Sequence, residues 1–249
     1  MNITIRNCEA NNNYGHGVQA WINSGDARNI SILVENVHVR GGPGCWHAAN
    51  PPGTEWSSKA GGFVFGRVHP PGGSLVIRDS TCRDTPLYGI YVWDLYGSGM
   101  RVTFSNVTLI NTANQPELLS PYSNQAAFSA LPNAPVGLDY LGEVESGLAL
   151  YDVVVHDALR RAWMQVNSHW APGAIVGNVR VIKKVIQPMP SCWVNSSAPL
   201  TNLSVECDIV ATDRIPPLRG YSSEASPDEF DNWTVRAALG RLSALSVFL

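Results

Sequence analysis

A short repeated unit constrains the fold of this chain more than any other feature. Each copy has an apolar residue, one further residue, an Asn or Asp, and then a return to alternation, as in Val34-Glu35-Asn36-Val37. The Asn or Asp stands at positions 7, 36, 79, 106, 152, 178 and 202. Four intervals between these markers run from 24 to 29 residues, and the other two, 43 and 46, are longer by one loop. In-phase copies at this period are typical of a solenoid, in which each repeat stacks on the next.

The repeats share one internal order. A strand with alternating apolar residues precedes the marker, a second short strand follows it, and a third, usually opened by Gly, comes later. In the second repeat these are residues 30–33, 37–39 and 62–65. Asn and Asp suit a sharp bend because they tolerate the left-handed conformation, and stacked amides can form a hydrogen-bonded ladder. The pattern predicts an all-β, right-handed parallel β-helix with three sheets and six to seven coils. The alternative is a set of unrelated strands in a sandwich.

This coil pattern resembles that of the pectin-lyase-like superfamily of right-handed parallel β-helices, over roughly residues 2–210. That superfamily contains polysaccharide lyases, glycoside hydrolases, epimerases, viral tailspikes and cell-surface proteins of unassigned role. The resemblance therefore implies the fold more strongly than it implies a function.

The coil pattern divides the chain into a parallel β-helix over residues 1–210 and a C-terminal tail over residues 211–249. Residues 213–232 are rich in Pro, Ser and acidic residues and are expected to be irregular. Val235, Leu239, Leu242 and Leu245 have helical spacing, so a short helix over residues 233–249 is predicted to cover the last coil. The first coil starts at residue 2 without a cap, so we expect a fragment of a longer chain, whose remainder would be a partner.

Composition excludes several classes of partner. The formal net charge is -3 and no basic run exceeds two residues, which argues against nucleic acid. No apolar segment approaches the roughly 18 residues of a membrane span. The sequence starts in a strand-like segment without a signal-peptide pattern. The five cysteines lack metal-site spacing, and we predict neither a metal nor another cofactor.

The two long intervals carry insertions at one corner of the predicted coils. They span about residues 41–60 and 111–135, and each leaves after the second strand and returns at the third. Because coils stack in register, the insertions are expected to rise on coils two and four and to flank a cleft over coil three. Functional residues commonly lie on such loops. The alternative is neutral variation of surface loops.

Strand alternation predicts an unusual outer face on the third strands. Inward positions are apolar, whereas several outward positions hold large aromatic rings beside amides. Such a face suits sugars, because rings pack on C–H groups while amides bind hydroxyls. The predicted substrate-binding residues on it are Trp21, Tyr91, Trp93, Trp163, Trp193 and Gln165. The alternative is that the insertions or the tail cover these rings.

The chemical candidates are carboxylates, one histidine and basic residues near the insertion corner. The candidate catalytic residues are Asp139, Asp94, Asp84, His16 and Arg160. Two outward carboxylates could act as acid and base in glycoside hydrolysis. Gly15-His16-Gly17 resembles an element of polygalacturonase-like hydrolases, although the acidic elements of that family and its Arg-Ile-Lys element are absent from the expected places. Arg161 and Lys183, together with Arg160, could instead bind a uronate or sulfate. The alternative is solvated loop charge.

Cysteines and glycosylation motifs bear on the compartment. A bridge between Cys192 and Cys207, or from Cys45 to a neighbour, is compatible with an oxidising compartment, while buried free thiols are the alternative. Six Asn-X-Ser/Thr sequons begin at Asn2, Asn29, Asn106, Asn195, Asn202 and Asn232, and Asn106 is expected to be too buried for glycosylation. An extracellular or cell-surface location is therefore predicted.

The sequence leaves two functions open. The first is an extracellular lyase or glycoside hydrolase that processes a polysaccharide on the face beside the insertions. The second is a non-catalytic β-helix module of a larger secreted or cell-surface protein, which binds glycan or acts as a spacer.

Overall fold

The computed structural model describes residues 2–11, 17–21, 29–41, 61–66, 72–85, 88–93, 95, 99–113, 134–139, 146–166, 170–186, 191–196, 199–212, 234–237, 240–242 and 245–248. Every regular element in these residues is a β-strand, and none is a helix. The fold class is therefore all-β, as the repeat predicts. Within this part of the chain no helix is long and apolar enough to cross a membrane.

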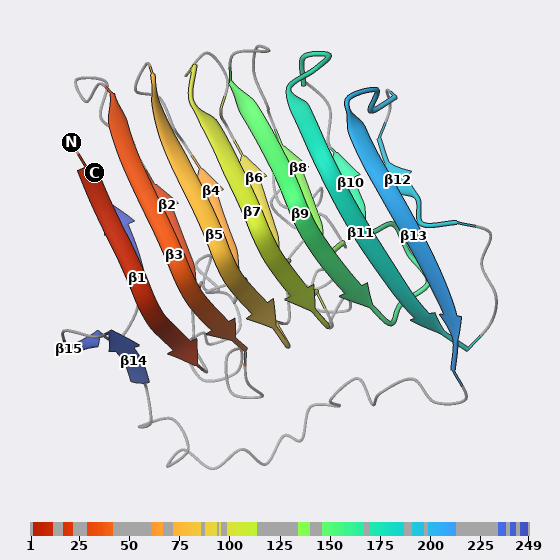
Figure 1. Ribbon diagram of the computed structural model, residues 1–249, viewed down its shortest axis with the longest axis horizontal. Helices are drawn as coiled ribbons and strands as arrows, with labels where there is room; N and C mark the ends of the chain where they lie inside the picture. Colours follow the sequence, from red (N-terminus) through yellow and green to blue (C-terminus); the bar gives the residue numbers. More distant parts are fainter. Residues whose placement is uncertain are drawn as a thin grey trace, which may run out of the picture.

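Seven long parallel strands lie side by side in one sheet (Figure 1). They are β1 (Asn2–Asn11), β3 (Ile30–Arg40), β5 (Gly73–Arg83), β7 (Arg101–Ile110), β9 (Gly147–Asp157), β11 (Ile175–Val185) and β13 (Leu203–Ala211). A second parallel sheet contains the short strands β2 (Val18–Trp21), β4 (Phe63–Gly66), β6 (Ile90–Trp93), β8 (Val136–Asp139), β10 (Met164–Val166) and β12 (Val194–Asn195). We call one long strand with the short strand after it a coil, so β13 opens coil seven. The arrangement is compatible with a parallel β-helix.

The marker residues form the bends within the long strands. Asn7, Asn36, Asp79, Asn106 and Asp152 have φ between 51° and 57°, the left-handed region that Asn and Asp tolerate. At each bend two consecutive residues face outward between two inward ones. The first and second predicted strands of each coil therefore run as one bent strand in one sheet. The described residues thus form two sheets, and the three-sheet arrangement stays a prediction.

Side chains at the bends form the predicted ladder. Asn36 Nδ2 donates to Asn7 Oδ1 at 2.8 Å, Asn106 Nδ2 to Asp79 Oδ1 at 2.7 Å, and Asn178 Nδ2 to Asp152 Oδ1 at 2.7 Å. Two details differ from the prediction. Ser204 pairs in register with Asn178, so Ser204 takes the marker position of coil seven instead of Asn202. Asn106 is also exposed, because a left-handed bend directs the marker outward.

The core lies between the two sheets. The residues predicted to face inward from the short strands are buried in it, except the partly buried Val194. Phe104 of β7 packs edge-on against Phe63 and Phe65 of β4, with ring centroids 6.1 and 5.9 Å apart. Inward positions on the long strands are fully apolar in most coils, for example Leu75, Val102 and Leu148. The sheets therefore bury one continuous core that no single coil could bury alone.

The C-terminal residues form strands, which corrects the predicted helix. They are β14 (Thr234–Ala237), β15 (Gly240–Leu242) and β16 (Leu245–Phe248). Strand β14 pairs antiparallel with β1, and β16 pairs parallel with β2, so the C-terminal residues extend coil one and not the last coil (Figure 1). The prediction from the helical spacing of the leucines is wrong here, because the unpaired edges of coil one offer backbone hydrogen bonds to an extended segment. Residues 213–232 lie outside the described residues.

Candidate functional site

The predicted aromatic face on the short strands is largely enclosed. Trp163 is fully buried in the core, and Tyr91 is 7% exposed and stacked on Tyr88 with ring centroids 4.4 Å apart. The prediction of outward, sugar-stacking rings at Trp163 and Tyr91 is therefore wrong. Trp163 lies just before β10, where strict strand alternation does not apply. For Tyr91, alternation predicts the direction of the side chain but not which residues cover it.

The other residues predicted on this face differ in their exposure. Trp193 is 38% exposed, and Gln165 is half-buried. Trp21, Trp93 and Asp139 occupy one register row at the ends of β2, β6 and β8, with Gly66 of β4 between the two tryptophans. Their side chains, together with His16 and Asp94, lie outside the described part of the chain, as do residues 42–60 and 114–133. The predicted cleft between the insertions thus stays a prediction.

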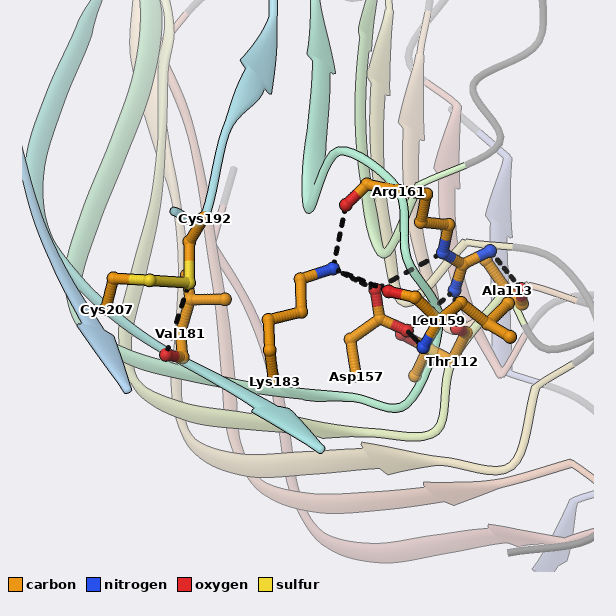
Figure 2. Close-up of polar contacts among 9 residues, drawn as sticks. All are labelled: Thr112, Ala113, Asp157, Leu159, Arg161, Val181, Lys183, Cys192 and Cys207. Atoms are coloured by element: carbon orange, nitrogen blue, oxygen red, sulfur yellow. Dashed lines mark hydrogen bonds and ion pairs between the residues drawn. A yellow bond between two sulfur atoms is a disulfide. The ribbon is translucent and has the colours of Figure 1, made fainter. Parts of the chain in front are cut away.

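A buried ionic cluster occupies the C-terminal ends of β9 and β11 (Figure 2). Lys183 Nζ lies 2.6 Å from Asp157 Oδ2 and donates to the carbonyl oxygens of Leu159 and Arg161 at 3.2 and 2.9 Å. All three ammonium protons thus have acceptors. Lys183 is 0% exposed and Asp157 4%.

Arg161 completes this cluster. Its guanidinium binds Asp157 through Nε and Nη2 at 3.3 and 3.2 Å, and it also donates to the carbonyl oxygens of Thr112 and Ala113. Burial lowers the pKa of Lys183, while the adjacent Asp157 carboxylate opposes that shift. The cluster ties the connection after β9 to the end of β7, which is a structural role. Arg161 and Lys183 are therefore not the outward substrate-binding groups that we predicted.

The remaining charged candidates are not brought together. Arg160 is exposed beside the cluster. Asp84 has φ of 55°, accepts a hydrogen bond from Asn111 Nδ2 at 3.0 Å and pairs with Arg83 Nε at 3.2 Å. Asp84 thus belongs to a second side-chain ladder at the ends of the long strands. Within the described residues, no group of three or more His, Cys, Asp or Glu side chains has the arrangement of a metal site.

A polar hollow opens on the outer side of the bends in coils four to seven. Its volume is about 370 Å³, within the range of ligand sites. The lining side chains come from four neighbouring long strands and are Asn106, Asp152, Val153, Val154, Asn178, Val179, Arg180, Ser204 and Glu206. Amide, carboxylate, guanidinium and hydroxyl groups therefore surround one surface site.

The hollow coincides with a break in the repeat. In β9, Tyr151 and Asp152 stand between Leu150 and Val153, whereas Asn178 alone stands between their partners Gly177 and Val179 in β11. Asn178 is not left-handed, and Gly177 takes φ of 135° instead. A Cβ on Gly177 would lie 1.7 Å from the carbonyl oxygen of Leu150. Only glycine allows this approach, so coils six and seven have one outward residue fewer at the bend.

The missing residue explains the exposure of Tyr151. Its row on the outer face runs from Arg6 through Glu35, Arg78 and Ser105 to Tyr151, where the register shift ends it. With no counterpart in coil six, Tyr151 is 44% exposed one residue before the lining residue Asp152. An exposed aromatic residue therefore directly precedes a residue that lines the polar hollow.

Ion pairs fix the charged side of the hollow. Arg180 Nε and Nη2 lie 2.8 and 2.7 Å from Asp208 Oδ2, and Arg180 Nε lies 4.0 Å from Glu206. His156, on the neighbouring strand, has its pKa lowered by burial and by the charges of Lys184 and Arg180. The guanidinium of Arg180 is therefore paired with carboxylates of the same protein.

The cysteines follow two of the predicted alternatives. Cys192 and Cys207 form a disulfide between the connection before β12 and β13, which confirms that pairing (Figure 2). Cys8 and Cys82 are buried free thiols, and burial raises the pKa of Cys82 to about 12. Thiols of this kind are chemically inert at neutral pH.

Sequence reasoning missed the hollow. The available signal was Gly177 within the copy Val176-Gly177-Asn178-Val179, which was counted as an ordinary marker. Glycine directly before a marker Asn signals a different backbone at that bend.

Comparisons with known proteins do not assign the chain to a family. No family model, no curated protein and no solved structure matches it.

Proposed function

We propose that this chain is a parallel β-helix module of an extracellular or cell-surface protein and that it binds polysaccharide on its outer surface. The observation that carries the proposal is the polar hollow at the bends, with the exposed Tyr151 beside it. This combination suits sugars, because hydroxyls exchange hydrogen bonds with amides and carboxylates while an aromatic ring packs on C–H groups. The proposal includes a closed, right-handed solenoid of the pectin-lyase-like type.

Two further observations support the proposal. Stacked coils repeat their surface positions at the strand spacing of about 4.8 Å, so a polymer with repeating hydroxyls meets repeating partners. The Cys192–Cys207 disulfide is compatible with secretion into an oxidising compartment.

The test is a binding screen of the chain against neutral, acidic and cationic polysaccharides. Affinity electrophoresis would report retardation, and assays for new reducing and unsaturated ends would report cleavage of the same samples. We expect retardation by at least one polysaccharide. A chain that migrates unchanged in every gel would contradict the proposal.

Polysaccharide cleavage is the second candidate function. It is favoured by the register row that aligns Asp139 with Trp93 and Trp21. Hydrolysis of a glycosidic bond requires a pair of carboxylates, so Asp139 needs a second acid within reach. Asp139→Asn tests this candidate: we expect new chain ends from the parent chain and loss of turnover in the variant. Binding without new ends would leave only the binding function.

A further inference from the structure

The hollow differs from the rest of the outer surface in its balance of charge and of hydrogen-bonding groups. The carboxylates of Asp152 and Glu206 line it, and Asp208 stands beside Arg180, so three carboxylates face one guanidinium. That guanidinium is paired with Asp208 and lies 4.0 Å from Glu206. Lys184 adds a second positive charge near the hollow, since both it and Arg180 lower the pKa of His156. The three carboxylates outnumber these two cations, which disfavours an anionic ligand.

The hydrogen bonds of the ladder also limit what the hollow can bind. Asn178 and Asn106 use their amide nitrogens to donate to Asp152 and Asp79. A carboxylate accepts about four hydrogen bonds, so Asp152 keeps acceptor capacity after binding Asn178. The lining is thus richer in acceptors than in donors, and its ligand must supply donors, as sugar hydroxyls do.

The break in the repeat lies within this site, which spans coils four to seven. Five earlier bends place two outward residues each, whereas Gly177 removes one and leaves Tyr151 at the end of its row. Bulges of this kind occur preferentially beside functional sites, because they redirect side chains without disturbing the core. The ladder hydrogen bonds hold Asp152 and Asn178 in place before a ligand arrives, which reduces the entropy cost of binding.

We infer that the hollow lined by Asp152, Asn178 and Glu206 selects a neutral, hydroxyl-rich polysaccharide over an acidic one. This inference rests on the proposed polysaccharide-binding function and assigns it a site and a substrate class. Hydroxyls of the sugar donate to the Asp152 and Glu206 carboxylates, and Tyr151 contributes apolar contact at the bend.

Asp152→Asn tests the inference. The amide retains an oxygen that can accept from Asn178, so the ladder is preserved, while the charge that strengthens hydrogen bonds from hydroxyls is removed. Asp79→Asn is the matched control, since Asp79 has the same bend conformation, with φ of 51° against 53°, and accepts from Asn106 at the same 2.7 Å. Asp79 is not part of the lining.

The probes are a soluble β-glucan, a galactomannan and polygalacturonate, each titrated against parent and variants by calorimetry or affinity electrophoresis. We expect binding to a neutral probe that weakens about tenfold in Asp152→Asn and is unchanged in Asp79→Asn. Equal affinities of the two variants would overturn the assigned site and leave the binding function standing. Tighter binding of polygalacturonate than of either neutral probe would overturn the substrate class. A parent chain that binds none of the probes would remove the function and the inference together.

Discussion

Coils one to five and coils six to seven form the bend in the long strand in two different ways. In the first group a left-handed Asn or Asp turns the strand and two residues face outward, as at Ser105 and Asn106. In the second group the turn at β11 uses Gly177, and one residue, Asn178, faces outward. The core on the inner side continues through both groups, since Val153 and Val179 remain in register and buried. The stacked coils therefore change their outer surface locally while their inner packing is maintained.

The ends of the long strands show a parallel contrast. In coils three and four, Asp84 and Asn111 form a hydrogen-bonded pair at the surface corner. In coils five and six, the corresponding Asp157 and Lys183 are buried and bind Arg161. The same register position thus holds a partly buried hydrogen-bonded pair in one half and an internal ion cluster in the other.

The largest expected effect tests this second contrast. Asp157→Asn leaves Lys183 and Arg161 without their counter-charge in a buried site, so we expect unfolding free energy to fall by about 3–5 kcal/mol. Asp84→Asn should cost less than about 1 kcal/mol, because Asp84 is only partly buried and its ionic partner Arg83 is exposed. Equilibrium denaturation in urea measures both. Similar losses in the two variants would show that the cluster is not electrostatically different from the corner ladder.

Gly177→Ala tests the bend of coil six. The added Cβ would lie 1.7 Å from the Leu150 carbonyl oxygen, so β9 and β11 must separate. We expect a loss of at least about 2 kcal/mol. Gly99→Ala is the control, because Gly99 also has a positive φ, 63°, but a Cβ added there would lie 3.7 Å from its nearest neighbour. Only the backbone strain of about 1 kcal/mol is then expected. Thermal unfolding of both variants would decide, and equal shifts in Tm would contradict the close approach.

Asn106→Ala and Asn178→Ala compare the two kinds of bend directly. Each removes a ladder donor at 2.7 Å, but only Asn106 is left-handed. We expect Asn106→Ala to cost about 1 kcal/mol more, and Asn106→Gly to recover most of that difference. Replacement of Asn178 by Gly should bring no recovery over Ala. Denaturant titration of the four variants is the measurement, and recovery at both positions would refute the distinction.

The smallest expected effect is a pH dependence near the hollow. The pKa of His156 is lowered in the folded protein, so the unfolded chain binds a proton more readily. Stability contributed by neutral His156 is therefore present above its ordinary pKa of about 6.5 and is lost as pH falls toward the folded pKa. His156→Gln should flatten the stability profile below about pH 6.5. If the variant keeps the parent's dependence of stability on pH, that dependence arises from other groups.

Much of the scaffold was predictable because it depends on local rules. Alternation placed Val92, Leu138 and Met164 inside, and the tolerance of Asn and Asp for positive φ placed the bends. The same local rules failed at Trp163 and at the C-terminal strands. Burial of Trp163 depends on contacts across the core, and β14 and β16 depend on free edges contributed by β1 and β2.

The candidate site was not predictable at the same level. A count of outward residues at one bend requires the register between β9 and β11, and register is a property of paired strands. Buried Lys183 was likewise predicted to lie at the surface, because a charged lysine is normally solvated. Its burial is possible only because the Asp157 carboxylate and the carbonyl oxygens of Leu159 and Arg161 bind its ammonium group.

The sequence by itself determined the repeat, the strand content and the bends, since these follow from steric preferences of single residues and from alternation along one strand. Tertiary structure decided which rings are covered, which charges are buried and where the outer surface is hollow. Those properties arise from atoms that are distant in sequence and are brought together by stacking, so no local pattern could specify them.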